Sequence, residues 1–239
     1  MNSISFRYRG RFGHFLKAEA SASAPSYPVP SRTVLLGLIG AILGLDKDQP
    51  QELLKTANLA VRGAIPATHW HSANLRKDPP AALSLRIQKA DKGSCGRQRN
   101  TIITQEWLIN PDYQVWAALP NPYHQELVRR LRFREWYFAP CLGLSEMMAD
   151  IIYLREDIVV PLESGLHEIT SIIRRNAGKI DLAASYEKEL AILMLRMPRE
   201  VSSVRAFKHE AYYIERQARL VPVHTDNAWL IGNEKVIFL

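Results

Sequence analysis

Apolar and polar residues alternate near the start of the chain. The alternation runs from Ile4 to Arg9, with large apolar side chains on one face and Arg7 and Arg9 on the other. A period of two is typical of a β-strand with one buried face. We therefore expect a strand whose second face is basic, followed by a glycine-punctuated turn that carries His14.

A second pattern is the uncharged apolar run from Val34 to Leu43, which follows a stretch spaced by prolines. A run without charge predicts a helix that is buried on all sides. Ser31 is a favourable N-cap, so we expect the helix to begin at Arg32. Glycines recur at spacings of three and four, which predicts that one helix face packs closely on another backbone. These glycines are Gly37, Gly40 and Gly44.

The amino end of this helix is a candidate phosphate site. Ser31, Arg32 and Thr33 lie where unpaired N–H groups and the helix dipole attract anions. Many helix ends bind only water, so the pattern alone leaves packing and RNA binding both open.

A later segment, from Gln88 to Thr101, contains no large apolar residue and cannot contribute to a core. Strand-like sequence on either side, Leu83 to Ile87 and Thr101 to Leu108, predicts a protruding β-hairpin. The segment is either a solvated loop or a basic finger that orders on nucleic acid, where cations displace counterions. The charge of the whole chain favours the finger. Its candidate contacts are Lys89, Lys92, Arg97, Arg99 and Asn100.

Residues 1–155 together predict the order strand, helix, strand, strand, helix, strand. Leu59 to Thr68 is the second expected strand, and Asn121-Pro122 opens the second helix. The aromatic residues 136–138 after that helix are expected in the core. The order is that of the ferredoxin-like fold, so we expect an α+β protein. Residues 156–239 hold short β-favouring pieces and predict a smaller β-rich C-terminal region, although 185–195 is equally compatible with a helix.

The 239 residues carry a net charge of +7. A basic balance fits an anionic partner, with nucleic acid first. No apolar run is long enough for a membrane span and no signal-peptide pattern is present, so we expect no membrane partner and a cytoplasmic location. Cys95 and Cys141 lie far apart without ligand spacing. His69 and His71 lack further ligands nearby, so we expect no metal and no cofactor.

Several motifs resemble, in order, those of a CRISPR-associated family. It is the fifth-numbered Cas family of the RAMP superfamily, whose members grip the 5′ handle of crRNA in type I Cascade. The resemblance covers about the first two thirds of the chain, and its most specific part is the proline-to-glycine helix motif. The motifs are the first strand 4–10, Tyr27-Pro-Val-Pro-Ser-Arg-Thr33 running into 36–44, Arg99-Asn-Thr101 before 108–115, and 137–146.

The resemblance implies an RRM-like palm and a β-hairpin thumb, here at about residues 88–104. It also implies a non-catalytic, RNA-binding subunit of a ribonucleoprotein complex for antiviral defence, in a subtype similar to I-B. Its expected partners are crRNA, target DNA reached through the complex, the backbone subunit and the large subunit. The carried-over contacts are Arg32, Thr33, Arg97 and Arg99, with Arg7, Arg9 and His14 as a looser inference.

Two alternatives remain beside this interpretation. Nuclease members of the family carry a tyrosine after the first helix and a lysine–histidine pair near mid-chain, whereas the only such pair here is Lys208-His209. Tyr27, Lys17 and His14 are a conceivable site for metal-independent cleavage of pre-crRNA, but packing and phosphate contact are the favoured interpretation. The other alternative is a stand-alone RNA-binding protein, although the stacked aromatic residues of an RRM strand are not evident.

Overall fold

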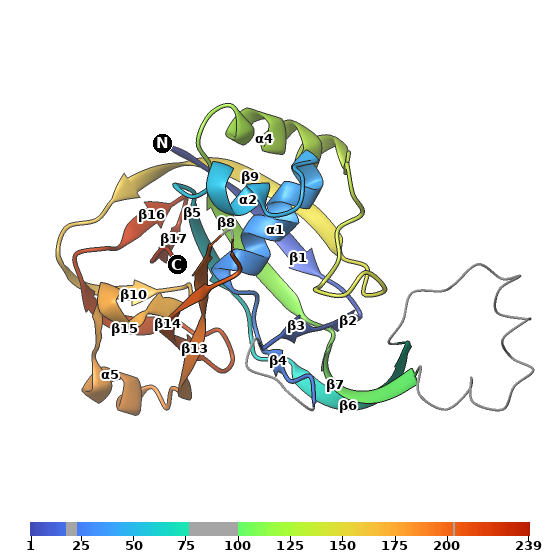
Figure 1. Cartoon of the computed structure of the whole chain (residues 1–239). Coiled ribbons are helices and arrows are strands. Elements are labelled where there is room, and N and C mark those ends of the chain that lie inside the picture. The colour runs from blue at the N-terminus through green and yellow to red at the C-terminus, as the bar shows by residue number, and fades with distance from the viewer. Residues whose placement is uncertain (18–22, 77–99, 203) are drawn as a thin grey trace, which may run out of the picture.

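A computed structural model describes residues 1–17, 23–76, 100–202 and 204–239. Its largest sheet has six antiparallel strands in the order β17-β16-β9-β1-β8-β5 (Figure 1). The bounds of these strands are Asn2–Arg9 for β1, Asn58–Arg62 for β5, Asp112–Ala118 for β8, Asp150–Pro161 for β9, Trp229–Ile231 for β16 and Glu234–Val236 for β17. The predicted first strand is therefore confirmed, and it lies inside the sheet.

Helices pack against this sheet. They are α1 (Arg32–Leu43), α2 (Gln49–Leu53) and α4 (Tyr123–Phe133), and Figure 1 shows α1 lying across the sheet with α4 beyond it. Burial of apolar side chains between the two layers is the main stabilising contribution. The core members without exposed surface include Ile4, Phe6, Tyr8, Leu35, Leu36 and Ile39. Within the residues that the structure describes, no helix has the length and apolar character needed to span a bilayer.

The three glycines lie in different environments, so the expected close packing along one face is wrong for Gly37, although Gly40 does pack tightly against another element. A Cβ placed on Gly37 would meet no atom within 4 Å, and this residue is exposed. Gly40 faces the ring of Pro50, which a side chain would strike. Gly44 ends the helix in the left-handed conformation, with φ of 79°. The helix start and its Ser31 cap are confirmed, whereas burial on all sides is not.

A hairpin extends away from the main sheet (Figure 1). Its arms are β6 (Ala67–Arg76) and β7 (Asn100–Ile109), and the short strand β2 (Phe12–Gly13) pairs with the outer edge of β7. The predicted continuous strand from Leu59 to Thr68 is wrong, because the chain breaks between β5 and β6 at a segment that contains Gly63 and Pro66. The predicted first arm, 83–87, lies outside the described residues.

The region after residue 155 is mostly β-structure, as predicted, but the main six-stranded sheet includes strands from both sides of residue 155. Residue 155 falls inside β9, and β16 and β17 complete the main sheet. Two further sheets have the orders β10-β15-β12 and β11-β14-β13. Their elements are β10 Gly165–Ile169, β11 Ile173–Arg174, β12 Lys179–Ile180, α5 Leu182–Glu187, β13 Ile192–Val201, β14 Phe207–Glu215 and β15 Val221–Thr225, with a 3-10 turn at Arg175–Ala177.

The aromatic segment after α4 lies on the surface, so the prediction of core packing is wrong for two of its three residues. Tyr137 and Phe138 are 63% and 53% exposed. Their backbone N–H groups donate to Ile42 and Ala41, which are carbonyl acceptors at the end of α1. The backbone thus runs along the outside of α1, and only Trp136 packs against the core.

Candidate nucleic-acid interface

The two arginines of β1 face away from the core, as the alternation predicts. Each is already paired with a carboxylate on a neighbouring strand: Arg7 Nη2 lies 2.6 Å from Asp112 Oδ2, and Arg9 Nη2 lies 3.1 Å from Asp150 Oδ2. The hydrogen bonds that Arg7 donates to the carboxylate of Asp112 raise the pKa of Arg7. Both pairs are about half exposed, so a phosphate can reach these cations only in competition with the carboxylates.

The predicted phosphate site at the start of α1 is largely occupied by the protein itself. Ser31 is buried, and its Oγ accepts the N–H of Val34 at 3.4 Å. The same oxygen lies 3.0 Å from Oγ1 of Thr33. Two of the three polar groups at the helix end therefore satisfy each other and the backbone. Whether they also contact RNA stays a prediction.

Arg32, the third of these residues, is turned inward and is only 6% exposed. Its Nη2 donates to the carbonyl oxygens of Lys55 at 2.7 Å and Ala57 at 3.1 Å. Burial lowers its pKa, and the neighbouring charge of Arg199 adds to this effect. The guanidinium therefore joins α1 to the chain that leads into β5. This geometry favours a structural role, while RNA contact by Arg32 stays untested.

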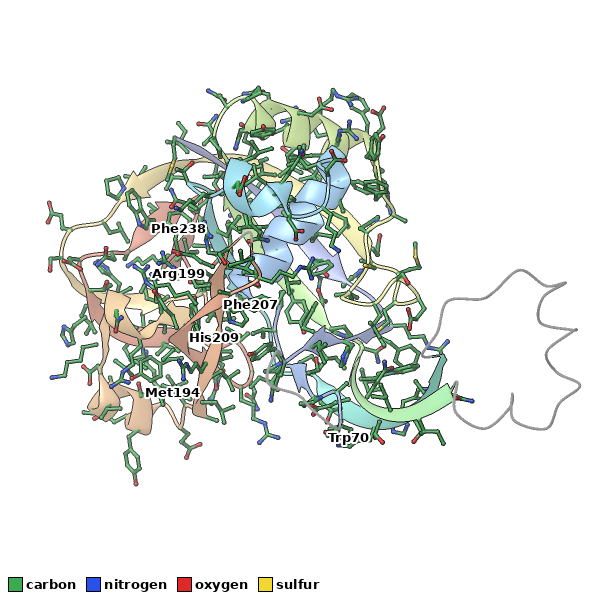
Figure 2. The ribbon with its side chains drawn as sticks, viewed as in Figure 1. Trp70, Met194, Arg199, Phe207, His209 and Phe238 are labelled. Carbon is green, nitrogen blue, oxygen red and sulfur yellow. The ribbon has the colours of Figure 1, made fainter. Side chains whose placement is uncertain are left out.

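A group of charged residues on β13 and β14 lies next to Arg32. Arg199 of β13, which Figure 2 labels, accepts a hydrogen bond from Arg32 at its carbonyl oxygen. Arg199 Nη1 lies 3.3 Å from Glu210 Oε1, and Arg174 approaches the same carboxylate at 4.0 Å. Tyr212 is buried beside them, and its pKa is raised to about 12, chiefly by desolvation and then by Glu210. A cavity of about 380 Å³ opens next to Arg32. Its walls carry both cations and carboxylates, which include Lys55, Glu52, Lys208 and Glu200.

His14 lies between β2 and the short strand β3 (Phe15–Leu16), which pairs with β4 (Ser26–Tyr27). His14 is 2% exposed, and its Nδ1 lies 2.8 Å from the carbonyl oxygen of Glu106. Lys17 lies over the ring of Tyr27, with Nζ 5.8 Å from the centroid. The structure therefore brings the lysine and tyrosine of the conceivable nuclease site together, but it buries the histidine.

The other predicted contacts belong to the hairpin. Lys89, Lys92, Arg97 and Arg99 lie outside the described residues, and Asn100 is the first residue of β7, opposite Arg76. In the part of the chain that is described, no cluster of three or more metal-ligating side chains is present. The role of the hairpin cations stays a prediction.

A row of rings on the described part of the hairpin was not predicted. His71 on β6 stacks on Trp107 of β7 with centroids 4.1 Å apart and planes inclined by 34°. Phe12 on β2 continues the row at 5.4 Å from Trp107, and Arg11 lies over the Phe12 ring at 5.4 Å. We call Phe12, His71 and Trp107 the ring ladder. Each of its members is partly exposed.

Sequence reasoning missed the ladder because its members come from three distant strands. His71 was weighed as a metal ligand and interpreted as a solvated or hydrogen-bonded histidine, and Trp107 was weighed only as part of a hairpin arm. The sequence did contain one signal, the order His69, Trp70, His71. In a strand this order places the two histidines on one face and the exposed Trp70 on the other. Figure 2 shows Trp70 on this hairpin. The register with Trp107 was not readable from the sequence.

Comparison with known proteins identifies the family. Residues 3–222 match the family described as CRISPR-associated protein (Cas_Cas5). No curated protein sequence matches the chain. Among solved structures, a chain of a "CRISPR RNA-guided surveillance complex" is similar with a TM-score of 0.57 at 15% identity, over 93% of this chain and 90% of that one.

A CRISPR protein from Archaeoglobus fulgidus is similar with a TM-score of 0.55 at 16% identity, over 100% of this chain and 99% of that one. At these identities, the two structures show that the fold is shared. The family match covers nearly the whole chain and confirms the resemblance seen in its motifs. The chain belongs to the Cas_Cas5 family of CRISPR-associated proteins.

Proposed function

We propose that the chain is a non-catalytic subunit of a type I CRISPR surveillance complex and holds the 5′ handle of crRNA. The observation that carries this proposal is the family match over residues 3–222. The similarity in fold to a chain of a CRISPR RNA-guided surveillance complex supports it. The net charge of +7 is compatible with a phosphate-rich partner.

The strand order supports this proposal. The four strands β9-β1-β8-β5 and the two helices follow the chain order β1, α1, β5, β8, α4, β9, which supports a ferredoxin-like, RRM-like palm. The β6–β7 hairpin leaves that palm between β5 and β8, which supports its assignment as the thumb. We infer that the palm and thumb contact crRNA and that the backbone and large subunits bind elsewhere on the surface. Target DNA is reached through the assembled complex in the cytoplasm, and the I-B-like subtype stays a prediction.

The proposed contacts divide into two groups. Arg7, Arg9 and Thr33 are accessible enough to meet phosphate, whereas Lys89, Lys92, Arg97 and Arg99 lie outside the described residues. Ser31, Arg32 and His14 are buried, so we infer that they position the surrounding backbone. Positioning residues should change affinity only through changes in folding.

Co-purification tests the proposal directly. The chain should be co-expressed with the other proteins of its CRISPR locus and a repeat-spacer array, then purified through a tag on another subunit. We expect a stoichiometric complex that contains RNA with a uniform, repeat-derived 5′ end. Crosslinking should join that 5′ end to this chain. Recovery of the chain alone, or with RNA of random ends, would refute the proposal.

Incubation of the isolated protein with repeat RNA in EDTA tests the absence of catalysis. We expect intact RNA, because His14 is buried and Lys17 is engaged with Tyr27. A discrete cut within the repeat that disappears in Tyr27→Phe would instead establish a processing endoribonuclease. The variant Tyr137→Phe, which changes an exposed tyrosine elsewhere, is the matched control.

A further inference from the structure

The ring ladder occupies one face of a three-stranded sheet whose order is β2-β7-β6. His71 lies opposite Gln105, and His69 lies opposite Trp107. Because side chains alternate along a strand, both histidines project on the same side as Trp107. Gln105 accepts the indole N–H of Trp107 at 3.1 Å, which fixes the orientation of the central ring. The ladder is therefore a row of oriented rings across three strands.

Packing within the protein accounts for only part of this row. Phe12 and Trp107 contact the main core, but both remain partly exposed, as does His71. His69 on the same face is exposed. Planar side chains that are held in orientation and left accessible to solvent are suited to bind another planar group.

The charges around the ladder indicate which planar group fits. Arg11 lies over Phe12 at one end, and two histidines lie at the other. The carboxylate on the same strand, Glu106, alternates to the other face, where it accepts the N–H of Ser26 at 2.9 Å. The ring face therefore combines π surfaces with cationic or protonatable groups. That combination matches a nucleobase attached to phosphate.

We propose that Phe12, His71 and Trp107 form a stacking platform for unpaired RNA bases at the base of the hairpin. This inference rests on the proposed RNA-binding function and adds a base-dependent component to it. Phosphate contacts supply affinity that falls steeply with salt, whereas stacking acts on the base itself and is tolerant of its sequence. The platform would hold bases that are displaced from pairing beside the palm.

Two oligonucleotides of equal charge separate these components. One is a single-stranded oligoadenylate of about 12 nucleotides, and the other is an abasic ribose-phosphate chain of the same length. Binding of the full chain to each is measured by fluorescence anisotropy at several salt concentrations. We expect the base-containing strand to bind about 5- to 100-fold more tightly, with similar salt slopes for both, because stacking is worth about 1–3 kcal/mol per base.

Trp107→Leu tests the platform by removing the ring while keeping an apolar side chain against the core. We expect it to remove most of the preference for the base-containing strand while affinity for the abasic strand and the salt slope stay unchanged. Trp70→Leu is the matched control, because Trp70 is 49% exposed on the opposite face of the same strand pair, and its preference should equal that of the wild type. His71→Leu, which removes the outer ring without touching the core, should lower the preference even if Trp107→Leu folds poorly.

The outcomes are distinguishable. If the wild type binds both strands equally, or if Trp107→Leu and His71→Leu retain the preference, the stacking proposal is overturned while RNA binding stands. An equal loss in Trp70→Leu also overturns it, since the effect would not belong to the ladder. If the wild type binds neither strand nor crRNA within its complex, the proposed function itself fails.

Discussion

Two groups of aromatic rings lie close in sequence but differ in what surrounds them. Tyr8, Phe15 and Tyr113 form a triangle in the main hydrophobic core, with centroids 6.1 to 6.4 Å apart and almost no exposed surface. The ring ladder begins at Phe12, between two members of that triangle in the sequence, and stays partly exposed. Neighbouring residues on one segment thus supply both the core and the hairpin surface.

The polar atoms of the two groups make the same distinction. The hydroxyl groups of Tyr8 and Tyr113 each donate to a carbonyl, of Cys141 and Pro28 respectively, at 2.7 Å. Every polar atom of the triangle is thereby paired within the protein. In the ladder, the indole N–H of Trp107 donates to the side-chain oxygen of Gln105 at 3.1 Å, while the rings themselves stay partly exposed. Ring content alone therefore does not separate a core cluster from a surface cluster, whereas burial and hydrogen bonding do.

The largest test of this difference is Phe15→Ala. Phe15 is 1% exposed, and its removal leaves a cavity between two tyrosines. We expect the free energy of unfolding to fall by about 3–5 kcal/mol, measured by urea denaturation. The equivalent change in the ladder, Phe12→Ala, should cost clearly less because Phe12 is partly exposed. Equal losses would show that the two groups do not differ in the way the burial indicates.

The same contrast applies to cations, and Arg32 is the buried case. Arg32→Gln removes the donors to Lys55 and Ala57, and we expect a loss of about 2–4 kcal/mol in the free energy of unfolding. The exposed Arg11→Gln should lose less than about 0.5 kcal/mol. For the folded Arg32→Gln protein, the salt slope of RNA binding should match the wild type. A slope that drops by about 0.7 would instead assign Arg32 to a phosphate.

Tyr113→Phe probes a single paired hydroxyl. The change leaves the Pro28 carbonyl without its partner, and we expect a loss of about 1–2 kcal/mol near neutral pH. Tyr137→Phe, at a 63% exposed position, should be neutral and serves as the control. Thermal denaturation monitored by circular dichroism measures both.

The pH dependence of that difference has a defined sign. Burial raises the pKa of Tyr8 and of Tyr113 well above the usual value, so the folded protein keeps both phenols protonated. The unfolded chain ionises them near pH 10. Their contribution is thus fully present below about pH 10 and is lost as the pH rises further. The alkaline loss of stability should be shallower in Tyr113→Phe, and an unchanged profile would contradict it.

The smallest expected effect belongs to the exposed arginine pairs of β1. Arg7→Ala breaks the contact with Asp112, and because both side chains are about half exposed, we expect a stability loss below about 1 kcal/mol. If Arg7 meets phosphate, the variant should bind RNA more weakly with a lower salt slope. Asp112→Asn removes the carboxylate that competes with phosphate for Arg7, so this variant should bind RNA more tightly.

Local patterns predicted the elements whose causes are local. The alternation of Ile4 to Arg9 gave β1, and Ser31 marked the start of α1, because period and capping depend on a few adjacent residues. The glycine spacing was misjudged because Gly37 faces open space, while the tight contact of Gly40 is made by Pro50 of α2, which the local pattern does not reveal. Tyr137 and Phe138 were placed in the core because hydrophobicity does not report that their backbone caps α1.

The candidate site was less predictable than the fold. Charge pattern identified Arg7 and Arg9 as outward-facing but could not show that Asp112 and Asp150 pair with them, because those carboxylates come from β8 and β9. Similarly, the sequence indicates only that Arg32 is a cation at a helix end. It does not show that the guanidinium donates to the backbone carbonyls of Lys55 and Ala57. The ladder required the register between β6 and β7, which is set by long-range pairing.

The position of β1 has a consequence for synthesis of the protein. This strand leaves the ribosome before both of its neighbours in the sheet, which are β8, at 112–118, and β9, at 150–161. During translation, β1 therefore cannot pair with either neighbouring strand until more than a hundred further residues have been synthesised. Its open edges and buried-face residues are exposed in the nascent chain, so slow elongation before β8 should favour aggregation or chaperone capture.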